Sequence, residues 1–150
     1  MRYFLVVLAV FGLLHLPPLA RWEWLAFPGN RAALALAIGV FLSGIHHAVF
    51  ANHFVDLLPE RIPGKSGQVY LSAVLRMAFG VGLVFISTRP AATIGTMILL
   101  CLVLPVNVRI ALQGNTTGQL IAGSWFLWLR LVVHVSWIGW CGWCLSLKSC

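Results

Sequence analysis

The amino-acid sequence predicts an all-α polytopic membrane protein, and its composition carries this prediction. Hydrophobic residues make up 61% of the chain, charged residues only 9%, and the mean hydropathy is +0.96. Soluble domains carry about 25% charged residues, so this composition excludes an ordinary soluble domain. The apolar residues also fall in long runs, and 150 residues leave room for four or five membrane-spanning helices of about 20 residues each.

Short polar segments that contain Pro or Gly divide the apolar runs and predict where the helices end. Pro17 ends the first run, and Pro90 suits the first position of a later helix. We treat residues 1–150 as a single integral membrane domain, with an N-terminal helix and turn in 1–30 and a four-helix core in 31–147. The predicted helices cover residues 3–16, 32–54, 69–87, 91–112 and 120–147.

The basic residues indicate contact with lipid. Ten Lys and Arg against three acids give a formal charge of +7. These basic residues stand singly at the ends of the apolar runs, where such residues contact lipid phosphates and set the topology. The two predicted membrane faces carry equal numbers of them, so the positive-inside rule assigns no orientation. We expect membrane lipids as partners and no nucleic acid.

Polar side chains lie deep inside four of the predicted helices. An unpaired Arg at mid-depth costs at least about 2.5 kcal/mol, so such groups turn toward the protein interior. Because consecutive helices alternate in direction, these groups fall in the same half of the bilayer. We predict a polar intramembrane pocket formed by His47, Arg76, Asn107, Arg130 and His134, with His46, His53, Asp56 and Arg109 at its rim.

Two interpretations of this polar cluster are open at this point. In the first, it is a structural network that fixes the register of the helices. In the second, it binds a lipid headgroup or a quinone carbonyl. Metal binding by His46, His53 and Asp56 is a further alternative, but the sequence has no H-x-x-x-H or E-x-x-H spacing, and we predict no metal site.

The cysteines suggest a different chemistry. Cys141 and Cys144 form a C-x-x-C pattern near the end of the last predicted helix, on the opposite membrane face from the polar cluster. In a thioredoxin-like context such residues form a redox pair. In a Trp-rich membrane helix they more commonly pack as small apolar side chains. Cys101, in the middle of an apolar run, is predicted to lie in the core.

Several of these residues lie in segments that resemble the DoxX-like family of small membrane proteins. The likeness spans about residues 32–140, in order and with suitable spacing. Its more specific parts are the Pro-x-Asn and Trp-Leu-Arg-Leu pieces. The segments are Gly44-Ile-His-His47 with Phe54-Val55, Pro59 to Pro63, Tyr70-Leu-Ser72, Pro105-Val-Asn-Val-Arg-Ile-Ala-Leu112 and Trp128-Leu-Arg-Leu131.

The resemblance implies a four-helix membrane bundle, here preceded by one further helix, in a bacterial inner membrane. By motif match it places His47, Asn107 and Arg130 at the family's polar positions. Arg76 departs from the family pattern, which tends to have an acidic residue in that segment, and this change makes the pocket attract anions. Some DoxX-like members are linked to thiosulfate-to-quinone electron transfer or to redox-stress complexes, usually beside a separate catalytic partner.

The sequence contains no complete catalytic set, which favours a non-catalytic role. Our first functional hypothesis is an accessory or scaffold subunit of a larger membrane complex, which binds other membrane protein subunits through its apolar, Trp-rich surface. The second is a quinone-linked electron-transfer component that uses the polar pocket. The third is a small carrier or channel.

Overall fold

The computed structural model describes residues 2–16, 23–58, 63–113 and 123–146, and every regular element in these ranges is helical. The predicted all-α class is therefore confirmed for the described residues. Two segments, Pro28–Val49 and Arg89–Arg109, are long and apolar enough to cross a membrane. The elements are α1 (Arg2–Leu13), the 3-10 helix η1 (Glu23–Ala26), α3 (Pro28–Val49), α4 (Ala51–Leu57), α5 (Lys65–Gly82), α6 (Arg89–Gln113) and α7 (Gly123–Ser146).

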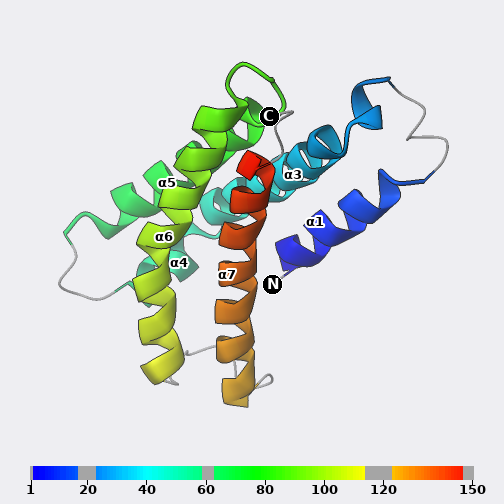
Figure 1. The fold of residues 1–150 in the computed structure, drawn as a ribbon. Coiled ribbons are helices and arrows are strands. Elements are labelled where there is room, and N and C mark those ends of the chain that lie inside the picture. Colours follow the sequence, from blue (N-terminus) through cyan, green and yellow to red (C-terminus); the bar gives the residue numbers. More distant parts are fainter. Residues whose placement is uncertain (1, 17–22, 59–62, 114–122, 147–150) are drawn as a thin grey trace.

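Helix α3 is the centre of the packing (Figure 1). It contacts α1, α5 and α7, and it also meets η1 and α4. Helix α6 packs against α5 and α7, and α6 and α7 run side by side. The core therefore forms around α3, from its own small and branched side chains Ala32, Ala35, Leu36 and Val40 and from Leu83, Leu100 and Trp137 of the other helices.

Glycines allow α3 and α5 to approach closely. A Cβ added to Gly80 would lie 3.0 Å from the backbone of Phe41, and a Cβ added to Gly44 would lie 2.9 Å from the carbonyl oxygen of Ala73. Only a hydrogen fits in these gaps, as is common where membrane helices pack through small residues. This approach sets the distance across which the polar side chains of the two helices meet.

The helices begin at local sequence signals with one exception, and α5 ends at Gly82, before the predicted end at residue 87. Helix α3 begins at Pro28, earlier than predicted, because Pro at the first helical position has a suitable φ and lacks only an N–H that would be unpaired. Helix α5 follows Gly64, whose φ of 65° favours glycine. The exception is the predicted helix 32–54, which breaks at Phe50 (φ −106°, ψ 34°).

The prediction of one continuous helix through this point was wrong. After Phe50, the short helix α4 packs mainly against α5. No Pro or Gly marks the break in the sequence. Ring contacts between α4 and the end of α3 accompany the break, and the rings of His47 and Phe54 stack across it.

Candidate functional site

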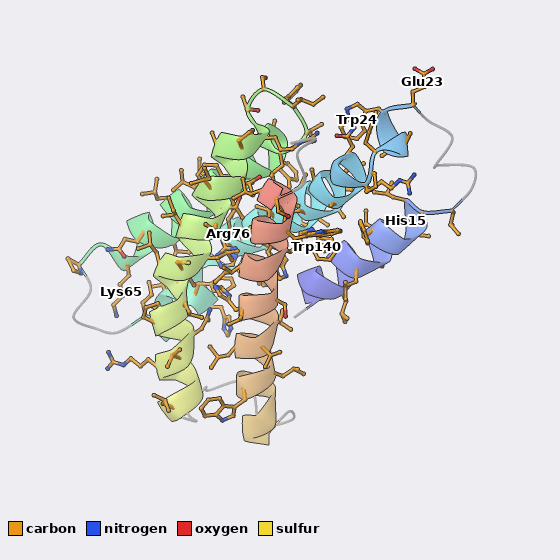
Figure 2. All side chains as sticks on the ribbon, viewed as in Figure 1. His15, Glu23, Trp24, Lys65, Arg76 and Trp140 are labelled. Carbon is orange, nitrogen blue, oxygen red and sulfur yellow. The ribbon has the colours of Figure 1, made fainter. Side chains whose placement is uncertain are left out.

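The predicted pocket residues of α3 and α5 meet at Ser43. Arg76 is 6% exposed and donates from Nη1 to Ser43 Oγ at 3.2 Å. His47 lies one turn after Ser43, and since a carbonyl only accepts, its Nδ1–H donates to Ser43 O at 2.8 Å. Figure 2 shows Arg76 inside the bundle, whereas Lys65 lies at its periphery. These bonds tie the buried guanidinium of α5 to the second half of α3.

Three imidazole rings surround Phe54 at the junction of α3 and α4. His47 stacks on the Phe54 ring, with centroids 3.9 Å apart and planes within 10°. His46 and His53 meet the same ring edge-on, at 5.5 and 5.7 Å. The two predicted rim histidines therefore share one aromatic contact, which they reach from two different helices. The ring cluster holds α4 against the end of α3.

The predicted pocket residues of α6 and α7 form a second polar group. His134 donates from Nε2–H to the carbonyl oxygen of Leu100 at 2.9 Å, so Nδ1 of the neutral ring accepts from Asn107 Nδ2 at 3.3 Å. Asn107 is buried. Leu100 lies in the turn before Pro105, which has no N–H to offer the α6 ladder. His134 thus connects α7 to α6 on both sides of the proline.

The other predicted residues of this cluster lie at the surface or outside the described part. Asp56 and Arg109 are exposed. Arg130 belongs to α7, but its side chain is not among those the structure describes. Within the described ranges, which contain His46, His53 and Asp56, no three His, Cys, Asp or Glu side chains are grouped as metal ligands.

The cysteines of the C-x-x-C pattern are buried thiols. Cys141 and Cys144 are both fully buried, and no disulfide joins them. Three residues apart on α7, they share one face and belong to the core around α3. The prediction of Cys101 as a core residue was wrong. It is exposed, because it lies on the outer face of α6 with Ile98 and Leu102.

A third polar group, which the sequence analysis missed, lies where α3 and α6 begin. Arg89 is fully buried. Its guanidinium donates to Asn30 Oδ1 at 2.7 Å, to Leu83 O at 3.0 Å and to Val84 O at 3.4 Å. It also lies 5.7 Å from the centre of the Trp24 ring, and Asn30 Nδ2 donates to the carbonyl of Trp24. One cation thus joins the start of α3, the end of α5 and the start of α6.

The C-terminal end of α5 explains why the charge of Arg89 can be buried. The helix ends at Gly82, and carbonyl groups at a helix C-terminus lack partners and form the negative end of the helix dipole. Arg89 supplies donors and positive charge to the turn that follows, and Thr88 Oγ1 donates to Gly82 O at 2.8 Å. The residues after the helix therefore cap it from inside the fold.

The interpretation of Arg89 as a topology charge at the end of an apolar run is corrected by this burial. A signal for the cluster was present in the sequence. Because consecutive long helices are expected to alternate in direction, Asn30 and Arg89 begin their helices at the same end of the bundle. The depth argument that grouped the predicted pocket residues applies equally at this end.

Comparison with curated proteins and with solved structures gives no match. A family model described as a domain of unknown function, DUF8561, matches residues 25–145. The match includes α3 to α7 almost completely and leaves α1 outside. It therefore contains all three polar groups except the ring of Trp24. Since most of its length matches, the chain belongs to the DUF8561 family.

Proposed function

We propose that this chain is a small integral membrane protein that acts as a non-catalytic accessory or scaffold subunit of a larger membrane complex. The proposal rests on the bonds that its buried polar groups make. Arg76, Arg89 and Asn107 are buried and bonded to side chains or carbonyls of neighbouring helices. Hydrogen bonds of this kind fix how membrane helices pack. They leave the outer surface of the bundle as the area for contact with other subunits.

The outer faces of α5, α6 and α7 supply that area. Large hydrophobic side chains along these helices are exposed, and an apolar surface of this extent is typical of contact with membrane or partner. Lipid chains and the helices of a second subunit are the surroundings that suit it. The exposed residues include Leu71, Val74 and Val81 of α5, Ile94, Ile98 and Leu102 of α6, and Trp128, Val132 and Val135 of α7.

The lengths of the helices support a four-helix membrane core of α3, α5, α6 and α7. At about 1.5 Å per residue, α7 with its 24 residues is about 36 Å long and α5 with 18 residues about 27 Å, close to the ~30 Å of a hydrocarbon layer. Together with α3 and α6, these helices agree in number with the DoxX-like bundle. That resemblance is also the basis for placing the protein in a bacterial inner membrane.

A quinone-linked electron-transfer component is the second candidate, favoured by the meeting of Arg76 and His47 at Ser43. A buried guanidinium and an imidazole are donors that suit a quinone carbonyl. Cys141 and Cys144, the pair that a redox role would use, are buried as thiols away from the surface. For that reason we place the accessory role first.

Purification from native membranes in a gentle detergent tests the two candidates against each other. Mass spectrometry measures the proteins that copurify with the tagged chain, and absorbance after extraction measures bound quinone. The accessory role predicts a partner in stoichiometric amount and no quinone. A lone protein with bound quinone that is lost in Arg76→Leu contradicts it and supports electron transfer.

Paired substitutions on the outer surface then locate the partner. Leu102→Trp enlarges the exposed face of α6, and Leu71→Trp makes the same change on α5. A partner seated on α6 is lost in the first variant and kept in the second, whereas lipid adapts to both changes. Each variant serves as the matched control for the other, since both add a ring to a leucine that the bundle does not bury.

A further inference from the structure

We infer that α1 is a removable cover over the wall of the bundle that contains Cys141 and Cys144, so that the reactivity of these two thiols depends on whether α1 is docked. The inference goes beyond the accessory role and does not depend on it. It concerns a modification site, the thiol pair, and the segment of this chain that closes it. Four observations carry the argument.

Helix α1 contacts the bundle through one narrow stripe. Val7 and Leu14 are buried, and Val10 and Phe11 lie between them at the spacing of one helix face. Most of the rest of the α1 surface is exposed, and Leu8 lies there beside the stripe. The contacts of this stripe are apolar or aromatic, and His15 at its end bonds within α1, to the carbonyl of Phe11.

Phe11 is the point at which α1 is held to α7. Its ring meets Trp140 edge-on at 5.1 Å and Trp143 at 5.8 Å, and the two tryptophans meet each other at 5.3 Å with perpendicular planes. Trp140 is itself fixed to α3, since its Nε1–H donates to the carbonyl of Ala32 at 3.3 Å. Figure 2 shows Trp140 between α7 and α3. Phe11 therefore packs against a pair of tryptophan rings that is itself held in place.

The two thiols lie directly beside the rings of Trp140 and Trp143. Cys141 and Cys144 each follow one of the two tryptophans in the sequence, so the thiols and the rings form neighbouring rows on α7. Both thiols are fully buried, in the same core cluster as Val7 of α1 and Ala32 of α3. Removal of α1 would take away Val7 and Phe11 and open this part of the cluster.

The position of α1 in the chain makes it separable. The family match begins at residue 25 and leaves α1 outside the matched domain. Its 12 residues span about 18 Å, too little to cross a hydrocarbon layer of ~30 Å on its own. Lipid chains are as apolar as leucine, so burial of apolar surface does not hold α1 in place. Its docking depends on the fit of its stripe and on Phe11.

Alkylation by N-ethylmaleimide tests the inference in the full-length protein in lipid vesicles. The thiol adds across the maleimide double bond, with its proton passing to the neighbouring carbon and no leaving group. Cys150→Ser removes the terminal thiol, and peptide mass spectrometry follows the other three. In the otherwise unchanged protein, Cys101 gives the reference rate for a thiol on the outer surface of the bundle, and Cys141 and Cys144 should react more slowly than Cys101.

Phe11→Ala removes both ring contacts with α7 and shifts α1 toward the undocked state. The rates at Cys141 and Cys144 are expected to rise about tenfold, the change that loss of two aromatic pairs allows, with the Cys101 rate unchanged. Leu8→Ala is the matched control on the exposed side of the same helix, and its three rates should equal those of the unchanged protein.

A second variant keeps the test decisive if Phe11→Ala disturbs the fold, which a faster reaction of Cys101 would reveal. A protease site inserted between residues 16 and 23 allows α1 to be cut from the folded protein in the vesicle and washed away. A rise in the alkylation rates of both thiols after the cut supports the inference. The inference is overturned if the alkylation rates of Cys141 and Cys144 stay low after the cut. It is also overturned if the two thiols already react as fast as Cys101 before the cut.

Discussion

The two buried arginines of this molecule are held in different ways. Arg89 lies in the turn after α5 and donates to two backbone carbonyls and to Asn30. Arg76 lies within α5 itself and donates to a hydroxyl of α3, that of Ser43. The first cation completes the end of a helix, and the second joins the flanks of two helices.

This difference shows two ways in which a helical bundle holds a buried positive charge. At the end of α5 the helix dipole and the carbonyls supply negative potential, so Arg89 acts as a cap placed inside the fold. Arg76 lies before the last turn of α5, and its bond to Ser43 crosses a distance that Gly44 and Gly80 keep short. The two arginines should therefore respond to different substitutions.

Loss of Arg89 should have the largest effect on stability. Arg89→Met leaves the carbonyl of Leu83 and Asn30 Oδ1 without their donor, at ~1–3 kcal/mol for each buried group, so we expect a loss of about 3 kcal/mol. Arg109→Met is the control, because Arg109 is exposed on the same helix and its replacement should change stability by less than about 0.5 kcal/mol. Unfolding in mixed micelles, followed by circular dichroism, measures both. Equal stability of the two variants would contradict the capping role.

The sequence was informative about residues deep in apolar runs and uninformative about those at their ends. A polar group such as Arg76 or Asn107 in the middle of a membrane helix must turn inward, and both are buried. Arg89 stands next to a turn, and a basic residue there is usually a surface anchor. Its burial depends on how residues 83–88 fold over it, which composition and spacing do not specify.

The removal of the hydroxyl that receives Arg76 should have the next largest effect. Ser43→Ala takes an acceptor from a buried cation, and hydrogen bonds to charged groups contribute ~1.5–3 kcal/mol, so we expect a loss of about 2 kcal/mol. Ser72→Ala is the control, since Ser72 Oγ donates only within its own turn, to Val69 O. The same unfolding assay compares them. If Ser43→Ala behaves like Ser72→Ala, the bond between α3 and α5 adds no stability.

Substitution of Gly80 tests whether the close approach of α3 and α5 maintains that bond. In Gly80→Ala the new Cβ would lie 3.0 Å from the backbone of Phe41, and overpacking of this kind costs ~1–3 kcal/mol. Ala is favoured over Gly in a helix by ~0.5–1 kcal/mol, so we expect a net loss of about 1 kcal/mol. Gly139→Ala meets nothing within 4 Å and should gain stability instead. Thermal unfolding in micelles measures both, and the same sign for the two variants would show that the approach is not tight.

The break at Phe50 shows a second limit of the sequence. The apolar run continues through it, so periodicity predicts one helix over 32–54. In the structure α3 ends at Val49, and the ring of Phe54 on α4 stacks on His47. This contact depends on the direction that α4 takes across α5, and a pattern within one segment contains no information about such a direction. The sequence analysis placed His46 and His53 together at the rim of a predicted pocket, and it did not predict that both would contact Phe54.

The smallest effect should come from the pair that joins α6 and α7. A double-mutant cycle of Asn107→Ala and His134→Phe isolates the bond between Asn107 Nδ2 and His134 Nδ1 from the other contacts of both side chains. Side-chain hydrogen bonds between membrane helices average about 0.6 kcal/mol in such cycles, because the separated helices also find partners, and we expect a coupling of that size. The control cycle combines Asn107→Ala with Ser136→Ala, whose hydroxyl bonds within α7 to Val132 O, and should show no coupling. A coupling near zero in both cycles would mean that apolar packing and the bond from His134 to Leu100 set the register of α6 and α7. A coupling above about 2 kcal/mol would exceed the range for such pairs. It would indicate that the pair belongs to a larger network with the groups at Ser43.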